Sequence, residues 1–481
     1  MDQKIKVLFL AAEAEPYIKV GGLADVAGSL PLALREIHNS TNNIGEFDVR
    51  LVLPLHPSIN TGAINLCPLV NFKLSDGSVD RQVKVYETFL DGMPVYFIQG
   101  EPLSNSLSVY SADLASDRKK YAFFSIAALA MTRAINWRPD IVHANDWHTA
   151  ISLYAIATKR EDPWVTGTRT VLTVHNLPFM GGDGADVLSE YKMPPLSEET
   201  LPAWALTQPL PLGLWAADAI IPVSPTYARE ILTSGFGCGL ETYLKSKSTK
   251  ITGILNGLDI KSWNPETDQT LPANFSTEDI SNRVNNKICL QQELQLKEDS
   301  TVPLLAMIGR IDRQKGIDIA FSALRMMADL GWQFVLLGSG DPTLEKEASD
   351  FQTEFQDRVR AVIRYDARLS RLLYGGCDIF LMPSRYEPCG LAQMIAMRYG
   401  SVPVVHATGG LIDTVQEGET GFDFVNPESQ AMKEAIERAF HLFSDPGKWR
   451  KIQRNGMGTD HSWASSAYQY ATIYQSLISG S

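Results

Sequence analysis

The feature that most constrains this chain is a unit that recurs along it: an apolar run, a polar or glycine-rich loop, and a segment with helical spacing. The clearest copies occupy residues 378–415, where apolar runs at 379–382 and 402–405 are each followed by a loop and a helix-like pattern. Strands that alternate with helices predict parallel sheets flanked by helices. We therefore expect an α/β fold.

The same unit is expected in the rest of the chain. A first strand at residues 4–12 precedes a glycine-rich loop and a helix at 27–37, and a helix is expected from Ala150. Further strands are expected at residues 49–54, 83–90, 95–98, 140–144, 169–174, 220–223, 251–255, 303–308, 334–338 and 359–365.

The length of 481 residues exceeds what one hydrophobic core supports, so at least two domains are expected. Residues 261–277 are rich in Pro, Asn, Asp and Thr and lack periodicity, which places a boundary near them. We predict an N-terminal domain at 1–258, a second domain at 259–455, and a helical tail at 456–481.

The composition of the chain argues against some kinds of binding partner. The chain has 43 Lys and Arg against 55 Asp and Glu, a net charge of −12, which argues against nucleic acid or an anionic membrane. No apolar run reaches the length of a bilayer span, and the N-terminus passes into a strand pattern without a cleavable signal shape. The five cysteines form no CxxC pair, which fits a reducing compartment and excludes a cysteine-based zinc site.

Polar side chains follow several of the predicted strands. Asp146, His148 and His175 stand at strand ends in the first half, and Glu387 stands at one in the second half. In an open parallel sheet, ligands bind at the carboxyl ends of the strands. A lone Glu in a loop is often only solvated, and a single His is more often structural than catalytic. The repetition at several strand ends favours a binding site.

Cations and paired glycines in the loops after predicted strands indicate phosphate-binding sites. Arg310 and Lys315 belong to three cations within six residues at the end of a predicted strand, a diphosphate site. Lys19 precedes the pair Gly21 and Gly22, and a second pair, 409–410, precedes a helix. These loops are neither GxGxxG nor Walker A motifs, and solvated basic turns are the alternative. Together they predict a nucleotide-sugar site.

These motifs together resemble the bacterial glycogen synthase and plant starch synthase family. The resemblance covers nearly the whole chain, in the family's order. It is carried by the motifs KVGGLADV (19–26), HANDWH (143–148), VHN (174–176), VSPTYA (223–228), ILNGLD (254–259) with WNP (263–265), GRIDRQKG (309–316), SRYEPCGL (384–391) and TGGL (408–411).

The resemblance implies a GT-B fold: two Rossmann-like domains that face each other across a cleft, with the last helix crossing back to the first domain. It implies transfer of glucose from ADP-glucose to the non-reducing end of an α-1,4-glucan, with retention of configuration. The donor leaves as ADP, and neither a metal nor another cofactor is needed. Glycogen, starch or a malto-oligosaccharide is the acceptor, in a bacterial cytoplasm or a plastid stroma.

The resemblance also implies roles for individual residues. Arg310 and Lys315 stabilise the leaving diphosphate, and Glu387 holds hydroxyls of the donor glucose. Asp146 and His175 position the sugar. Further donor contacts are implied for Lys19, Gly21, Gly22, Tyr365 (along the adenine), Thr408, Gly409 and Gly410.

The chain departs from the family pattern at three places. Residues 179–184 read FMGGDG where the family usually has Tyr-Gln-Gly, and residues 208–211 read QPLP, which loses a family lysine. His406 stands where the family usually has Arg. One hypothesis is that donor binding is kept while acceptor choice or rate has changed, and neutral drift is the other. A related retaining transferase with another acceptor and a catalytically weak glucan-binding paralogue stay open, as does ADP- against UDP-glucose.

Overall fold

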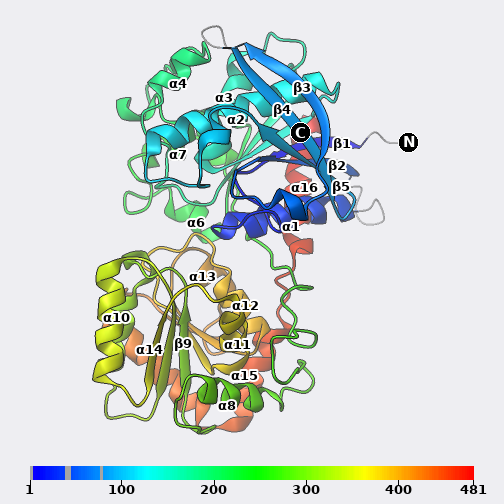
Figure 1. Ribbon diagram of the computed structural model, residues 1–481. Coiled ribbons are helices and arrows are strands. Elements are labelled where there is room, and N and C mark those ends of the chain that lie inside the picture. The colour runs from blue at the N-terminus through cyan, green and yellow to red at the C-terminus, as the bar shows by residue number, and fades with distance from the viewer. Residues whose placement is uncertain (1–3, 38–44, 76–79, 481) are drawn as a thin grey trace. The chain divides into compact units, whose positions relative to one another are not determined.

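A computed structural model describes residues 4–37, 45–75 and 80–480 of the chain, which form two compact units (Figure 1). The first unit contains the chain up to Gly257 together with the segment from Trp463 onward. The second unit is the continuous segment Leu258–Ser462, so it interrupts the first in sequence. Each unit contains a sheet with flanking helices, which confirms the predicted α/β class.

The first unit is organised around an eight-stranded sheet in the order β3-β4-β5-β2-β1-β6-β7-β8. Its central strands are nearly fully buried, as parallel strands covered on both faces must be. The strands are β1 (Ile5–Leu10), β2 (Phe47–Pro54), β3 (Cys67–Ser75), β4 (Asp80–Leu90), β5 (Met93–Gln99), β6 (Ile141–Asn145), β7 (Arg169–Val174) and β8 (Ala219–Pro222).

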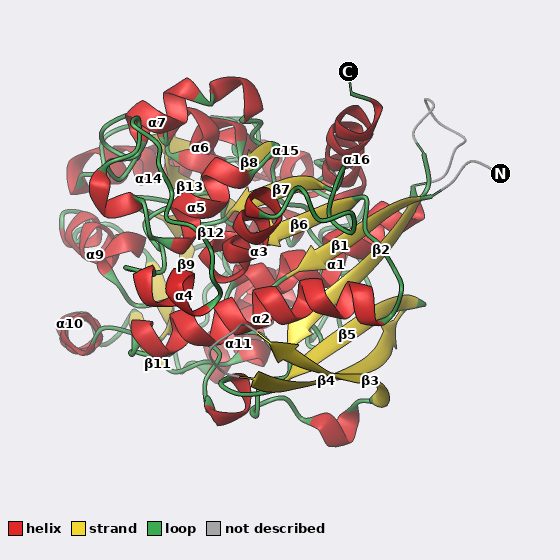
Figure 2. Ribbon diagram, turned by 90° about the horizontal axis from the view of Figure 1, so that it is seen from above, coloured by secondary structure: helices red, strands yellow, loops and turns green. Residues whose placement is uncertain are grey.

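The strands of this unit differ from the prediction in three ways. The sheet is not wholly parallel, because β4 runs antiparallel to both β3 and β5 at one edge (Figure 2). β3 was not predicted, since an exposed edge strand lacks the apolar run that marks a buried one. Residues 251–255 form only a single bridge, Ile251 with Ile220, in place of the predicted strand. Gly253 there packs against the Ser224 carbonyl, where a Cβ atom would lie 2.3 Å away.

Helices cover the first sheet, and the last of them completes its core. Trp463, Tyr470 and Tyr474 of α16 belong to the same buried cluster as the central strands β1 and β2. The helices are α1 (Gly22–Glu36), α2 (Leu114–Ala134), α3 (Asp146–Thr158), α4 (Ala185–Glu190), α5 (Pro209–Ala216), α6 (Pro225–Glu230), α7 (Glu241–Ser246) and α16 (Trp463–Ser479).

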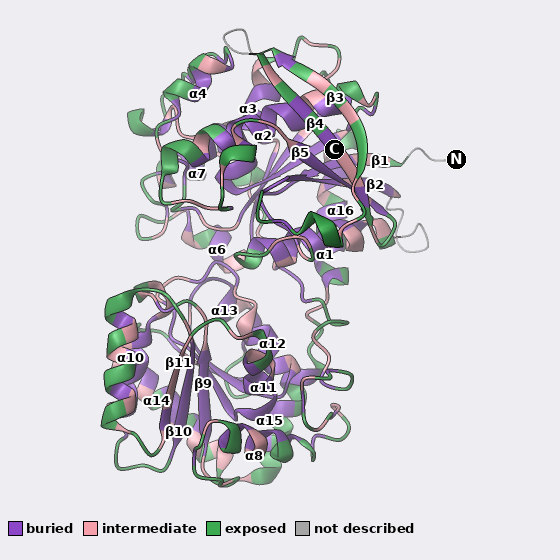
Figure 3. Ribbon diagram, viewed as in Figure 1, coloured by how far each residue is buried: buried purple, intermediate pink, exposed green. Residues whose placement is uncertain are grey.

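The second unit contains a six-stranded parallel sheet in the order β11-β10-β9-β12-β13-β14. Its strands are buried under helices such as α10, whose outer face is exposed (Figure 3). The strands are β9 (Leu304–Ile308), β10 (Gln333–Gly338), β11 (Val359–Ile363), β12 (Ile379–Met382), β13 (Val402–His406) and β14 (Phe422–Phe424). The helices are α8 (Arg283–Glu293), α9 (Ile317–Arg325), α10 (Pro342–Glu354), α11 (Ala367–Gly376), α12 (Ala392–Arg398), α13 (Gly409–Thr414), α14 (Ser429–Phe443) and α15 (Pro446–Gly458).

Within the described part of the chain, no helix combines the length and apolar character that crossing a membrane requires.

Candidate functional site

The loops after β9 and β12 meet at one edge of the second sheet. Lys315 ends a 3₁₀ turn (Arg313–Lys315) after β9, and its Nζ lies 2.5 Å from Oε2 of Glu387, in the loop after β12. The Ser384 hydroxyl donates to the same carboxylate oxygen at 3.0 Å. β9 and β12 are neighbours and parallel, so their carboxyl ends bring this pair together. The carboxylate of Glu387 is buried, so the ammonium group neutralises a charge that would otherwise be costly.

Arg310 lies on the same loop but is exposed. Its Nη1 is 2.9 Å from Asp312 Oδ2, and its Nη2 donates to Gln314 Oε1 at 3.2 Å. Gln314 in turn donates to the carbonyl of Tyr386, next to Glu387. The guanidinium is therefore held on a loop that is tied to the Glu387 loop, while 61% of its side chain stays open to an incoming anion.

The glycine pair at the start of α13 packs against the Glu387 loop. A Cβ atom on Gly409, whose φ is +47°, would lie 1.9 Å from the carbonyl oxygen of Glu387. The Gly410 N–H donates to the carbonyls of Glu387 and Pro388, both at 3.2 Å. The close approach of these two loops requires glycine at these positions. The expected phosphate contacts of Thr408, Gly409 and Gly410 stay a prediction.

Two more residues of the second unit lie near strand ends. His406, at the end of β13, places Nδ1 2.7 Å from the Ser384 carbonyl and Nε2 3.0 Å from the Val425 carbonyl. It therefore bridges the loops after β12 and β14 where the family pattern has Arg. Tyr365 follows β11 and is 84% exposed, which leaves its ring face available.

In the first unit, the loop before α1 is shaped by a residue that the sequence reasoning missed. The Glu13 carboxylate accepts hydrogen bonds from the N–H groups of Val20 and Gly21 and, at 2.9 Å, from the Tyr110 hydroxyl. Burial raises the pKa of Glu13. Lys19 is ion-paired to Asp25, with its Nζ 2.6 Å from Oδ1. The one signal in the sequence was a carboxylate directly after the first strand.

Asp146 lies where β6 passes into α3. The helix was predicted to start at Ala150, and it starts four residues earlier, at Asp146. The Asp146 φ of +54° makes the tight turn that allows this early start, a conformation that Asp tolerates better than most residues. Oδ1 of Asp146 accepts from the N–H groups of His175 at 2.7 Å and Asn176 at 3.3 Å. Nε2 of His175 lies 2.9 Å from Asn145 Oδ1. Hydrogen bonds thus join the end of β6 and the start of α3 to the loop after β7.

The electrostatics of this pair follow from burial. Burial raises the pKa of Asp146 to about 7, against the lowering effect of the two N–H donors. Loss of contact with water lowers the pKa of His175 to about 3, so its ring is neutral at any ordinary pH. A neutral imidazole can accept or donate a hydrogen bond but cannot act as a cationic acid. His148, also predicted, is buried with its ring centroid 4.2 Å from that of Trp147.

Comparison with known proteins identifies the family. A family model for the starch synthase catalytic domain matches residues 6–246, and a model for group 1 glycosyl transferases matches residues 291–456. Glycogen synthases from Anaeromyxobacter sp. and Syntrophotalea carbinolica are 39% and 36% identical to this chain, with 98% of this chain and 99% of each relative covered. The chain belongs to the glycogen synthase and starch synthase family.

Solved structures agree with this family and its fold. The catalytic domain of starch synthase IV from Arabidopsis thaliana, determined with ADP and acarbose, is 32% identical with a TM-score of 0.89 over 99% of this chain and all of that chain. Sucrose-phosphate synthase from Thermosynechococcus elongatus is 19% identical with a TM-score of 0.63 over the same share of both chains, which supports the fold alone. This glycogen and starch synthase relative is thus a glycosyltransferase with the GT-B fold, as the resemblance implied.

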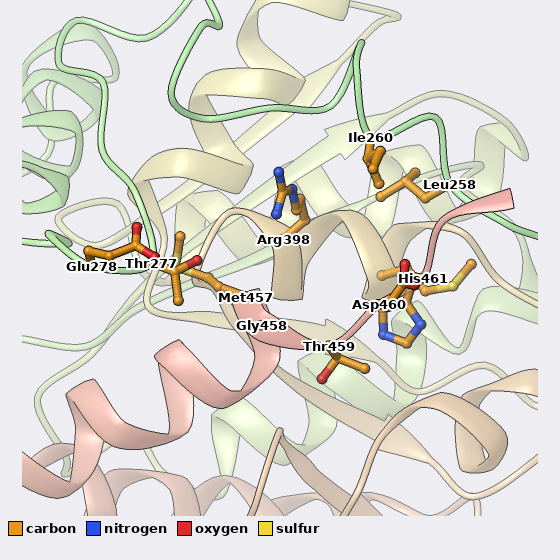
Figure 4. Close-up of a pocket in the computed structure, with 11 residues that line it drawn as sticks. Leu258, Ile260, Thr277, Glu278, Arg398, Met457, Gly458, Thr459, Asp460 and His461 are labelled. Carbon is orange, nitrogen blue, oxygen red and sulfur yellow. The ribbon is translucent and has the colours of Figure 1, made fainter. Parts of the chain in front are cut away.

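Each unit contains a hollow on its surface. In the second unit, a hollow of about 310 Å³ is lined by Arg398, Asp460, His461 and residues at the two ends of the inserted segment (Figure 4). In the first unit, a hollow of about 390 Å³ lies beside the segment that departs from the family pattern. Among the residues that the structure describes, no group of three or more His, Cys, Asp or Glu side chains is arranged to hold a metal ion.

Proposed function

We propose that this protein transfers glucose from ADP-glucose to the non-reducing end of an α-1,4-glucan, with retention of configuration. The observation that carries the proposal is the linked set of Arg310, Lys315 and Glu387 at one edge of the second sheet. Glycogen synthases are similar to this chain over nearly its whole length. This similarity supports a role for the three residues in glucose transfer.

The donor diphosphate is assigned to Arg310 and Lys315. An ammonium group has three N–H donors, and Glu387 and Lys315 form one contact, so the same Nζ can also bind a phosphate oxygen. The exposed guanidinium of Arg310 adds a second cation. Both stabilise the charge that develops as ADP leaves, which is where preorganised positive groups contribute most. Because Lys315 and Ser384 both contact Oε2, we assign Oε1 of Glu387 to a hydroxyl of the donor glucose.

The remaining predicted residues complete the donor site in this proposal. Lys19 with Gly21 and Gly22 contacts the distal phosphate, and Thr408, Gly409 and Gly410 supply further phosphate donors. The exposed ring of Tyr365 stacks on the adenine. Asp146 and His175 orient the transferred sugar, with His175 acting as a neutral hydrogen-bonding group.

The reaction is proposed to proceed on one face of the donor sugar. The acceptor hydroxyl attacks the anomeric carbon as the bond to ADP breaks, and a phosphate oxygen of the departing ADP takes the hydroxyl proton. This route gives retention without a protein nucleophile. We place the reaction in a bacterial cytoplasm or a plastid stroma.

The test is glucose transfer from ADP-glucose and, separately, from UDP-glucose to glycogen and to maltotriose. We expect transfer from ADP-glucose to glycogen, with a loss of at least roughly 100-fold in turnover for Glu387→Ala. Near-normal turnover of that variant would contradict the proposed site. Binding of glycogen without transfer or affinity for either donor would identify a glucan-binding paralogue instead.

A further inference from the structure

Two pairs of polar side chains join the neighbouring parallel strands β6 and β7 toward their carboxyl ends. Nε2 of His143 lies 2.7 Å from Oγ1 of Thr173. Two residues further along the chain in each case, Nε2 of His175 lies 2.9 Å from Oδ1 of Asn145. Asn145 is the last residue of β6, and His175 directly follows β7. The second pair therefore connects the buried interior of the sheet to the strand-end site.

The orientation of the Asn145 amide is fixed by a third strand. Its Nδ2 donates to the carbonyl of Leu10 at 2.9 Å, and Leu10 lies on β1, on the other side of β6. A carbonyl oxygen can only accept, so the amide nitrogen must face Leu10 and the amide oxygen must face His175. The side chain is fully buried, so no water replaces either contact. Asn145 thus offers His175 a hydrogen-bond acceptor and no donor.

This acceptor determines which nitrogen of His175 carries the proton. Because the amide oxygen can only accept, Nε2 of the ring must donate. Loss of contact with water lowers the pKa of His175 to about 3, so the ring holds a single proton at neutral pH. Nδ1 is then a free acceptor, and no residue within 4–37, 45–75 and 80–480 hydrogen-bonds to it. His175 keeps some exposure, so an incoming hydroxyl can reach this nitrogen.

The opposite tautomer is disfavoured by the same contact. It would set the lone pair of Nε2 against the oxygen of Asn145 at 2.9 Å, with no proton between them. Unpaired buried acceptors are costly enough to disfavour that tautomer by roughly 10-fold or more. His143 provides the contrast, since its partners are the hydroxyls of Thr173 and Tyr474, which can each donate or accept. The partners of His143 allow both tautomers, whereas the partner of His175 allows one.

We propose that Asn145 is a positioning residue for the transfer reaction: it fixes His175 in the Nε2-protonated tautomer, so that Nδ1 accepts a hydrogen bond from a hydroxyl of the transferred glucose. The inference rests on the proposed function, in which His175 orients that sugar. Asn145 acts through His175 and does not itself touch the sugar. An acceptor that is prepared before the sugar arrives spares the site a rearrangement on binding.

Nitrogen-15 NMR of the full-length, unaltered protein tests the tautomer directly. The chain has eight histidines, and the signals of His175 are those that disappear in His175→Gln. We expect a neutral ring at neutral pH with its proton on Nε2, the nitrogen that couples strongly to both ring C–H protons. A proton on Nδ1, or on both nitrogens, overturns the proposal. The measurement needs no substrate and no variant of Asn145, so it does not depend on turnover or on the folding of such a variant.

Variants of Asn145 test whether the tautomer matters for transfer. Asn145→Leu keeps the branched shape and removes the acceptor, so the proton should move at least partly to Nδ1. The kcat with ADP-glucose should fall roughly 10-fold, the value of a hydrogen bond, and the KM for glycogen should stay the same. Asn145→Asp returns an oxygen opposite Nε2, and it should retain the Nε2-protonated tautomer and more of the turnover than Asn145→Leu.

Thr168→Val is the matched control for the loss of one buried hydrogen bond. Thr168 is buried just before the start of β7, at the end of the strand away from His175, and its hydroxyl donates to the Pro139 carbonyl at 3.1 Å. This variant should change neither the tautomer nor kcat.

Two results with the variants overturn the proposal, because a purely structural role explains each of them. One is a loss of kcat in Asn145→Leu without a change of tautomer, and the other is an equal loss in Asn145→Leu and Asn145→Asp. Absence of transfer by the unaltered protein, with the Nε2-protonated tautomer present, would refute the proposed function and support the control of the tautomer by Asn145. The two failures are therefore distinguishable.

Discussion

The linked side chains at the strand ends of the second unit contrast with the hollow that follows Asp146 in the first unit. In the second unit, Lys315, Glu387, Ser384 and His406 form a linked set that joins the loops after β9, β12 and β13. In the first unit, the hollow next to Asp146 is lined by aromatic and small residues without charge. Loss of one member of the charged set leaves a buried partner unsatisfied, which is costly. An apolar wall can change as a set while its volume is conserved.

The largest effect is expected from breaking the charged set. Lys315→Ala removes the cation from the buried Glu387 carboxylate and from the proposed phosphate, so kcat/KM should fall by about 10²- to 10³-fold. The midpoint of urea unfolding should fall as well, because an uncompensated charge is left inside. The double variant with Glu387→Ala should be less destabilised than the sum of the two single variants. Additive losses would show that the two residues act independently.

The second-largest effect is expected in the pH dependence of kcat/KM, through Asp146 of the first unit. Because the pKa of Asp146 is about 7, its carboxylate is ionised above that pH, and kcat/KM should fall about tenfold per pH unit below it. Asp146→Asn keeps the acceptor oxygen and tolerates the positive φ, and it should remove this acidic limb. An acidic limb that persists in the variant assigns it to another group.

The same raised pKa has a consequence for stability. A carboxylate with a folded pKa of about 7 and an unfolded pKa of about 3.9 favours the folded state while it is protonated. Its contribution is complete below about pH 4 and is lost as the pH rises through 7. Asp146→Asn should therefore weaken the pH dependence of the unfolding free energy between those values, as measured by urea titration at several pH values.

A third variant separates the hollow from the charged set. Gly181→Ala forces a side chain into a left-handed position against Trp147, so we expect a loss of about 1–3 kcal/mol in the free energy of unfolding. The KM for ADP-glucose should stay the same. Gly92→Ala, with a similar φ and open space around it, controls for backbone strain alone. A rise in the donor KM for Gly181→Ala would show that the hollow and the charged set are coupled.

The smallest effect is expected at Tyr365. Its ring is 84% exposed and contributes little to packing, so Tyr365→Ala should leave the unfolding midpoint unchanged. Loss of stacking on the adenine should raise the KM for ADP-glucose about fivefold, the lower end for removal of a ring beneath a base. An unaltered donor KM would remove Tyr365 from the site.

The sequence predicted the parallel units well because buried strands are continuous apolar runs and the loops after them carry distinctive residues. It did not predict β3, whose residues are largely exposed, or that residues 251–255 make a single bridge in place of a strand. The pairing of Lys315 with Glu387 was foreseeable from neighbouring strand ends. The contact between residues 179–184 and 208–211 was not, because it depends on steric fit between a glycine and a proline far apart in sequence.

The position of α16 has a consequence for the order in which the protein can fold during synthesis. Tyr474 of this helix lies 2.6 Å from Nδ1 of His143 on β6, and Tyr470 and Ala467 are fully buried in the same core. The first unit therefore lacks part of its interior until the ribosome has made residues after Trp463. The second unit is a continuous segment that emerges earlier and can fold as it does so. The unit translated first is thus the unit that is finished last.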